Sequence, residues 1–312
     1  GKCPKRIRRR PAMAYHNPVM VSESIAGLAI RPEGTYVDAT FGGGGHARAI
    51  LAQLTTGRLF GFDQDEDAVA NAPDDPRLTL INNNFRYLRN FLKFHNALPV
   101  NGLLADLGVS GHQFDVAERG FSTRFNGSLD MRMDRRKENT AARIVNTYSE
   151  EMLASLFYKY GEIPNARRLA GLIVTERSTE TIHTTSKLKG IADRCAPKGQ
   201  EFKYEAQVFQ ALRIEVNQEL AALEEFLEQA VESLVPGGRL VIIAYHSLED
   251  KLVKNWFKAG NAEGLLKKDF YGNPLAPLRP VNNKVITPEE EEIQNNNRAR
   301  SAKLRIAEKR KS

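Results

Sequence analysis

The chain has 312 residues, 41% of them hydrophobic, which is enough to bury a full core in one large domain with an insertion or in two domains. No apolar run approaches the ~20 residues that a membrane-spanning helix requires, and the two cysteines form no C-x-x-C pair and no disulfide framework. The basic start is not followed by an apolar stretch, so we expect no signal peptide and a cytoplasmic location.

The net charge of +7 is concentrated at the two ends of the chain. Residues 1–10 contain six basic side chains and no acid, and we predict a flexible basic arm over residues 1–13. Residues 298–311 contain seven basic side chains and one acid, and the alternation in 302–307 predicts an edge strand with exposed cations. Both segments favour salt-dependent contact with RNA, although a merely solvated surface would have the same composition.

Short apolar runs alternate with helical patterns along much of the chain. The alternation predicts an α/β fold with a doubly wound, Rossmann-like parallel sheet. The strands are predicted at 35–41, 58–62, 78–81, 102–106 and 239–245.

The first predicted strand runs into four consecutive glycines in residues 35–47. Glycines allow positive φ angles and a close approach of the backbone to a ligand, and the following helix offers unpaired N–H groups. Gly42, Gly44 and Ala47 fit the pattern G-x-G-x-x-A, and Asp63, 21 positions after Gly42, can hold a ribose hydroxyl. This segment predicts a site for either NAD or S-adenosylmethionine.

The charge around the glycines separates these two cofactors. Asp38, Asp63 and Asp106 each end a predicted strand, and strand ends converge on the ligand crevice of an open parallel sheet. We therefore expect three acids on one rim, which would repel a pyrophosphate but attract the sulfonium and ammonium groups of S-adenosylmethionine. Capping of helices or turns is the alternative role for each of these aspartates.

Phe85 follows the strand predicted at 78–81 through three asparagines and is expected near the same rim. A flat ring at this place could stack on adenine. Packing into the core is, for an isolated phenylalanine, the more common alternative.

Between about residues 115 and 205 the strand pattern lapses and helical periodicity replaces it, as in 150–160. We predict an inserted helical subdomain for substrate recognition. A single long helix is then predicted over 207–234, with its stop at Pro236-Gly237-Gly238. The predicted division of the chain is a methyltransferase domain of residues 14–114 and 208–312 and an inserted subdomain of residues 115–207.

Several segments resemble the bacterial family that methylates the exocyclic N4 of a cytosine in the decoding centre of 16S ribosomal RNA. A lone G-x-G-x-x-A is weak, but L-D-M-R-M-D followed by Y-H-S-L-E-D is highly specific. The matching segments are Y-H-N-P-V-M (15–20), D-A-T-F-G-G-G-G-H (38–46), D-L-G-V-S (106–110), E-R-G-F-S (118–122), L-D-M-R-M-D (129–134), F-Q-A-L-R-I-E-V-N (209–217), Y-H-S-L-E-D (245–250) and R-A-R-S-A-K-L-R (298–305).

The resemblance implies S-adenosylmethionine as the cofactor and 16S rRNA, within the small ribosomal subunit, as the partner. It implies cofactor contacts from Gly44, Gly45, His46, Asp63, Phe85, Asp106 and Gln113. This chain departs from the family pattern at Gly111 and His112, where a second serine and a variable residue are usual, and in N-G-S-L-D, where D-G-P-L-D is common.

The side chains favour amino methylation over a covalent route. Methylation at carbon five of cytosine needs a thiolate, and Cys195 lies away from every predicted strand end while Cys3 lies in the basic arm. Amino methylation needs an unstacked base, an aligned amine and an acceptor for its proton. We predict Asp106 and His246 as the catalytic polar groups, with a helix cap or a bond to Glu249 or Asp250 as the alternative role of His246.

The six histidines form no H-x-x-x-H or Cys/His cluster, so we predict no catalytic metal. The resulting hypothesis is an S-adenosylmethionine-dependent methyltransferase that acts on a cytosine amine of 16S rRNA. Two alternatives remain at this stage: an NAD-dependent oxidoreductase on a Rossmann fold and a non-catalytic RNA-binding protein. The number of chains in the active particle is left open.

Overall fold

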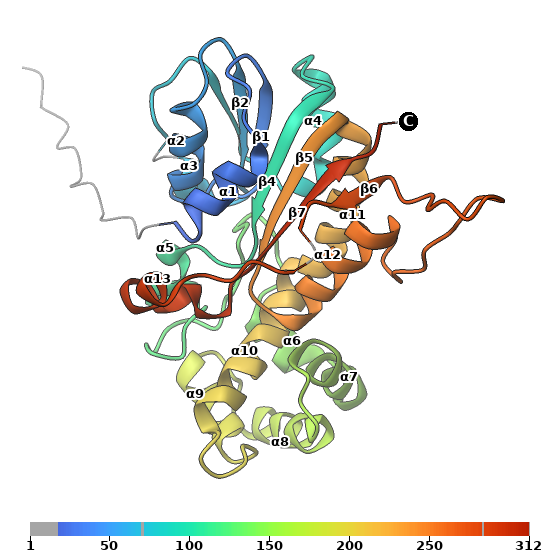
Figure 1. Cartoon of the computed structure of the whole chain (residues 1–312). Helices are drawn as coiled ribbons and strands as arrows, with labels where there is room; N and C mark the ends of the chain where they lie inside the picture. The colour runs from blue at the N-terminus through green and yellow to red at the C-terminus, as the bar shows by residue number, and fades with distance from the viewer. Residues whose placement is uncertain (1–17, 70–71, 283, 312) are drawn as a thin grey trace, which may run out of the picture.

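The computed structural model describes residues 18–69, 72–282 and 284–311, so the predicted arm of residues 1–13 lies outside the described residues. Its centre is a seven-stranded sheet with the strand order β3-β2-β1-β4-β5-β7-β6 (Figure 1). Strands β1 to β5 pair in parallel, whereas β7 runs antiparallel to both of its neighbours. The strands are β1 (Thr35–Asp38), β2 (Arg58–Phe62), β3 (Leu78–Ile81), β4 (Val100–Asp106), β5 (Leu234–Ala244), β6 (Leu278–Pro280) and β7 (Lys303–Lys309).

The doubly wound α/β fold and all five predicted strands are confirmed, with different bounds for three of them; β4 begins at Val100, two residues before its predicted start. Strand β1 ends at Asp38, three residues early, because the chain turns there into the glycine loop. Strand β5 begins at Leu234, which pairs with Val100 before the register shifts. The predicted helix stop at Pro236-Gly237-Gly238 is therefore wrong, since these residues form the irregular start of a strand.

Successive strand residues point to opposite faces of the sheet, and both faces are covered by helices. Tyr36 packs with α1 and α2 on one face, while Val37 packs with α4 and α11 on the other. None of the helices in the described part of the chain is both long and apolar enough to cross a membrane. The helices are α1 (Val21–Leu28), α2 (Gly45–Leu51), α3 (Glu66–Val69), α4 (Leu88–Phe94), α5 (Gly111–Asp115), α6 (Ala141–Thr147), α7 (Glu150–Gly161), α8 (Ala166–Thr179), α9 (Thr185–Asp193), α10 (Glu201–Asn217), α11 (Glu219–Ser233), α12 (Ser247–Ala259) and α13 (Glu290–Asn295).

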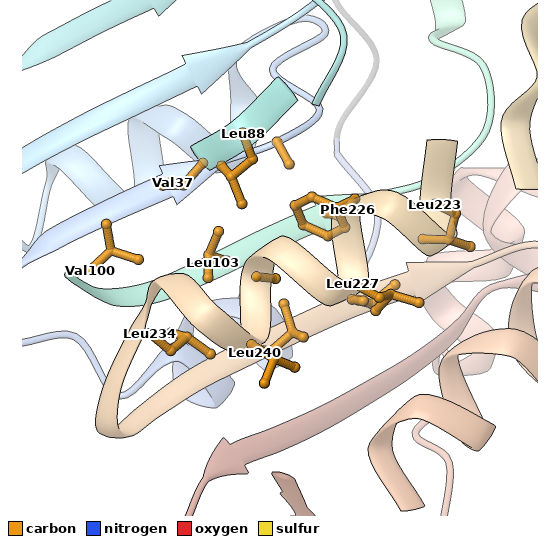
Figure 2. Packing of buried hydrophobic residues seen from close by; sticks show 14 of the residues in the cluster. Val37, Leu88, Val100, Leu103, Leu223, Phe226, Leu227, Leu234 and Leu240 are labelled. Carbon is orange, nitrogen blue, oxygen red and sulfur yellow. The ribbon is translucent and has the colours of Figure 1, made fainter. Parts of the chain in front are cut away.

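Figure 2 shows how α11 closes one face of the sheet. Leu223, Phe226 and Leu227 from this helix point toward side chains of the central strands, among them Leu103 and Leu240. The same cluster includes Phe85, just beyond β3, which packs edge-on against the fully buried ring of Phe226 at 5.1 Å between ring centroids. The hydrophobic core therefore holds the Phe85 ring in place at the carboxyl edge of the sheet.

Helices α6 to α10 pack on one another around a separate hydrophobic cluster, below the sheet in Figure 1. Leu153 and Phe157 of α7, Leu169 of α8 and Leu212 of α10 are among its fully buried members. Between β4 and β5 the described residues form helices and loops and no named strand. The helical character predicted for this part of the sequence is confirmed.

The single helix predicted over 207–234 is wrong, because the chain forms two helices that meet at Gln218. Gln218 has a φ of 53° and a ψ of 42°, a left-handed conformation that ends α10 and starts α11. The apolar spacing continues across this break since each helix buries a face of its own. Helix α10 buries its apolar face in the helical cluster and α11 buries its face against the sheet.

The strand predicted at 302–307 is confirmed as β7, but its place at the sheet edge with exposed cations is wrong. The three residues of β6 cover β7 and form the edge instead. Arg305 and Lys303 both pair with Asp250 of α12, at 2.7 Å and 3.4 Å between nitrogen and oxygen. A period-two pattern of charges predicts a strand but not the acid that faces it from a distant helix.

Replacement of the buried ring in this core should lower stability. We expect Phe226→Ala to reduce the free energy of unfolding by about 3–5 kcal/mol, because it removes apolar contacts and leaves a cavity. The control is Phe94→Ala on the surface of α4, where the ring is 79% exposed and the loss should stay near or below about 0.5 kcal/mol. Urea denaturation of both variants measures the difference, and equal losses would contradict this account of the core.

Candidate functional site

A cavity of about 610 Å³ opens at the carboxyl ends of the parallel strands. One side is formed by the loops that follow β1, β2, β3, β4 and β5, as expected for an open parallel sheet. The other side is formed by α10 and by segments that include 121–124 and 296–298. The cavity therefore lies between the sheet and the helical cluster. Its volume is in the ~300–1,000 Å³ range of sites that bind small molecules.

The predicted cofactor residues divide into two groups by their positions. Gly45, His46, Asp63, Phe85, Asp106 and Gln113 all line the cavity. Gly44 does not line it; with a φ of 72° it caps α2, and a side chain there would meet the ring of Phe41 at 2.8 Å. Gly44 thus shapes the turn. Only a residue without Cβ fits at this φ and this close to the Phe41 ring.

Asp63 joins the glycine turn to β2. Its carboxylate accepts the N–H of Gly42 at 2.7 Å and the N–H of Asp65 at 2.9 Å, one bond on each oxygen. Burial raises the pKa of Asp63 to about 6, against the lowering effect of these two backbone bonds. Because each carboxylate oxygen has two lone pairs, both still have capacity for hydroxyl groups of a ligand.

Asp38 does not line the cavity, so the predicted rim of three acids is wrong. Its side chain is buried beneath the glycine turn, where it accepts the N–H of Thr40 at 3.2 Å. Burial raises the pKa of Asp38 to about 6, although His46 nearby lowers it. The strand-end rule placed the residue at the correct edge of the sheet but did not fix the direction of its side chain.

Asp106 lies at the end of β4 and faces the cavity. It accepts the hydroxyl of Tyr245 at 2.7 Å, and Nδ1 of His46 lies 3.9 Å from its other oxygen. Burial raises the pKa of Asp106 to about 7; Tyr245 opposes this shift, and Glu249 and Glu292 add to it. No Lys or Arg among the described residues is within salt-bridge distance of this carboxylate.

His46 is buried against the same wall. Its Nε2 donates to the carbonyl of Val19 at 3.0 Å, which leaves Nδ1 as the nitrogen that faces Asp106. Burial lowers the pKa of His46, while Asp38 raises it. A neutral ring here does not neutralise the carboxylates around it.

His246 also lines the cavity, and its alternative role as a helix cap is confirmed. Its Nδ1 accepts the N–H of Glu249 at 3.4 Å at the start of α12, and its Nε2 lies 3.1 Å from the Glu249 carboxylate. Burial opposes the charge of Glu249, but His246 and Arg213 lower its pKa below the usual value. Asp250, the other suggested partner, bonds to Arg305 instead.

Arg213 and Glu219 form a second ion pair beside His246, which the sequence did not reveal. The guanidinium of Arg213 donates two bonds to the Glu219 carboxylate, at 2.8 Å and 3.0 Å. Possible ligand atoms of Glu219, His246 and Glu249 lie within 4.8 Å of one another, so the geometry could accommodate a metal ion. Because Arg213 already supplies a positive charge there, the absence of a catalytic metal stays our prediction.

Gln113 holds the loop after β4 rather than pointing its amide freely into the cavity. It forms a capping box with Ser110 at the start of α5, and its Nε2 donates to Asp65 at 2.8 Å. Asp65 in turn pairs with the buried guanidinium of Arg119 at 2.7 Å. Arg119 also donates to the carbonyls of Arg132 and Met133, in the L-D-M-R-M-D segment.

This network was not predicted, because its members are about 50 residues apart and no sequence spacing connects them. Arg119 has only a 2% exposed side chain and joins the loop after β2 to the loop that leads into the helical cluster. Burial of a charge is tolerated when an opposite charge and hydrogen bonds satisfy it. The cofactor side of the cavity therefore depends on a residue that does not itself line it.

A doubly wound sheet with a glycine turn, and two cavity carboxylates without a Lys or Arg ion pair among the residues described, fit the class of enzymes that bind a small cationic cofactor. The profile of the MraW methylase family matches residues 13–310. The ribosomal RNA small subunit methyltransferase H of Bacteroides thetaiotaomicron is 57% identical over 299 residues, which cover 96% of this chain and 98% of the relative. The relative of the same name from Amoebophilus asiaticus is 56% identical over 97% of this chain and 98% of its own length.

The chain belongs to the MraW methylase family, so the resemblance drawn from the sequence is confirmed. It is an S-adenosylmethionine-dependent methyltransferase, and the NAD-dependent oxidoreductase and the non-catalytic RNA-binding protein are both wrong. The solved structure of an rRNA methylase from Streptococcus thermophilus covers 96% of this chain and 100% of its own, with a TM-score of 0.43 and 14% identity, a similarity too low to support an argument.

Loss of Arg119 should destabilise the protein strongly. We expect Arg119→Met to lower the free energy of unfolding by about 3–5 kcal/mol, because Asp65 would remain buried without its cation. The control is Arg136→Met, whose half-exposed pair with Asp134 should contribute no more than about 1 kcal/mol. Denaturant unfolding compares the two, and Asp65→Asn in the Arg119→Met background should recover part of the loss. Strictly additive effects would contradict a direct pair.

The affinity for S-adenosylmethionine should fall as the pH is lowered. Asp63 and Asp106, with pKa values of about 6 and about 7, are ionised at pH 8 and become protonated below these values. The attraction for a cation is therefore present above pH 7 and is lost between about pH 7 and pH 5.5. Isothermal titration across this range should show about a tenfold or larger weakening. Asp106→Asn should remove the part of the change centred near pH 7, and an affinity that does not vary with pH would refute the assignment.

Proposed function

We propose that this methyltransferase modifies the exocyclic N4 amine of a decoding-centre cytosine in 16S rRNA. The rRNA substrate would be part of the small ribosomal subunit. The observation that carries the proposal is the Asp106 carboxylate, which faces the cavity with a pKa of about 7 and has no Lys or Arg partner among the described residues. The names of the relatives and the ordered family segments support this substrate. A cytoplasmic location of the protein is part of this proposal.

The cofactor half of the cavity fits a cationic nucleoside. S-adenosylmethionine, when bound, supplies a methyl group on a positively charged sulfur. Asp63 would accept the ribose hydroxyls, Phe85 would contact the adenine, and the turn at Gly45 and His46 would line the methionine end. Gln113 would act by fixing the loop after β4, because its amide is already bonded to Asp65.

The other half of the cavity would receive the unstacked base. Tyr245 fixes one oxygen of Asp106 and so presents the second oxygen toward the cavity. The free oxygen would orient the N4 amine and accept its proton as the methyl group is transferred. His246, held by Glu249, would contact the base from the start of α12.

The helical region would recognise the RNA around the target. We assign this role to residues 115–207, the predicted inserted subdomain, because the helical cluster forms the wall of the cavity opposite the sheet. Arg298 lies at the same opening, where it pairs with Asp115 and stacks over Phe114 at 5.4 Å. Residues 14–114 and 208–312 would form the methyltransferase domain.

Removal of the Asp106 charge should abolish methyl transfer. We expect Asp106→Asn to lower the turnover rate by about a hundredfold or more, since a general base typically contributes ~10²–10⁴. The unfolding midpoint should not fall, because a buried carboxylate with a raised pKa does not stabilise the fold at pH 8. Tyr245→Phe, which keeps the carboxylate, should lose less.

The product identifies the substrate. Nucleoside mass spectrometry of small-subunit rRNA should show N4-methylated cytidine in cells with the protein, and loss of it in cells without the protein or with Asp106→Asn. Retention of this nucleoside in the deletion strain would reject the proposed target. Full activity of Asp106→Asn would instead reject only the role of Asp106.

A further inference from the structure

The loop between α12 and β6 carries the most exposed aromatic side chains among the described residues. Phe270 is 98% exposed and Tyr271 is 86% exposed, and their rings meet edge-on at 5.6 Å between centroids. In Figure 1 this loop extends outward from the β6 edge of the sheet. None of its residues lines the cavity. Two adjacent exposed aromatic side chains on a projecting loop are unusual for a surface that binds no partner.

Polar bonds, and not apolar packing, fix the backbone turn that carries the rings. The carboxylate of Asp269 accepts the N–H of Tyr271 at 2.9 Å and the N–H and the side-chain amide of Asn273 at 2.8 Å and 2.9 Å. These bonds lower the pKa of Asp269, so its charge stays inside the turn. An antiparallel bridge between Lys268 and Pro274 closes the base of the hairpin. The tip is therefore ordered before any partner binds, which lowers the entropic cost of binding.

The hairpin and the helix that precedes it carry an excess of positive charge. Residues 251–275 contain five lysines against two acids, and one of these acids is Asp269 within the turn. All five lysines are exposed, and none has an ion-pair partner among the described residues. The spacing of three of them places these cations on one face of α12. The lysines are Lys251, Lys254 and Lys258 on α12 and Lys267 and Lys268 at the hairpin.

We infer that this surface, the hairpin of residues 267–275 with the lysine face of α12, binds single-stranded RNA outside the cavity. Unstacked bases would stack on Phe270 and Tyr271, and phosphates would contact the lysines, a combination typical of single-strand binding. An apolar groove of a partner protein would match the two rings but would leave the row of lysines without counter-charges. Identification of this RNA as segments of small-subunit rRNA rests on the proposed function.

The test is a binding measurement with the full chain and deproteinised small-subunit rRNA. We expect Phe270→Ala with Tyr271→Ala to weaken rRNA binding by about tenfold or more, because each base stacked on an aromatic ring contributes substantially to the binding free energy. S-adenosylmethionine affinity should not change, because the hairpin lies outside the cavity. Phe270→Trp should retain binding whereas Phe270→Leu should not, which separates stacking from general apolar contact. Lys254→Ala with Lys258→Ala should make the affinity less dependent on salt.

The matched control is Phe94→Ala, an equally large exposed ring on α4 without the lysine face, which should bind as the wild type does. Unchanged rRNA binding by the double alanine variant would overturn the inference. So would a loss seen only with assembled small subunits and not with deproteinised rRNA, because that result would indicate a protein partner. Loss of rRNA binding together with normal N4-methylcytidine chemistry on a short RNA would support the surface, and failure of the wild-type protein to form N4-methylcytidine would count only against the proposed function.

Discussion

The burial of carboxylates at the ends of parallel strands, complete for Asp38 and partial for Asp63 and Asp106, is the constraint on which this site depends. Asp38, Asp63 and Asp106 all have pKa values raised by burial, to about 6, 6 and 7. A folded protein normally pairs such groups, and this one does so nearby, at Asp65 with Arg119 and at Glu219 with Arg213. Asp63 and Asp106, which also face the cavity, have no Arg or Lys ion pair in the part of the chain that the structure describes. A positively charged cofactor would supply the missing charge, so part of the cost of burying these acids would be recovered as binding energy.

The paired acids have a different task, which is to join the sheet to the helical cluster. Arg119 connects the loop after β2 to the 129–134 segment, and Asn217 then ties that segment to the end of α10 through bonds to Met131 and Met133. Gln218 follows immediately, and its left-handed conformation turns the chain from the helical cluster into α11. The break in the predicted long helix thus lies where two hydrophobic cores meet at the cavity wall.

The sequence predicted what depends on local pattern and missed what depends on distant partners. Apolar runs gave the five strands, because both faces of the sheet are buried, and the strand-end rule brought Asp63, Phe85 and Asp106 to one cavity. The direction of Asp38, the neighbours of β7 and the roles of Arg119 and Arg213 are set by residues far away in the chain. A single sequence contains no signal that couples such positions. Family segments marked Arg119 as part of a motif without indicating its partner.

The carboxylates of Asp63 and Asp106 create a problem for an enzyme that acts on RNA, because charges that attract the cofactor repel phosphates. The attraction for the polyanion must then come from surfaces at a distance from the reacting atoms. Exposed lysines lie in such places, on α12 and at the base of the projecting hairpin. Charge separation of this kind lets the base alone enter the acidic site while the backbone stays outside. With the two basic ends set aside, residues 11–297 contain 32 basic and 37 acidic side chains, so the net positive charge of the chain lies in its ends.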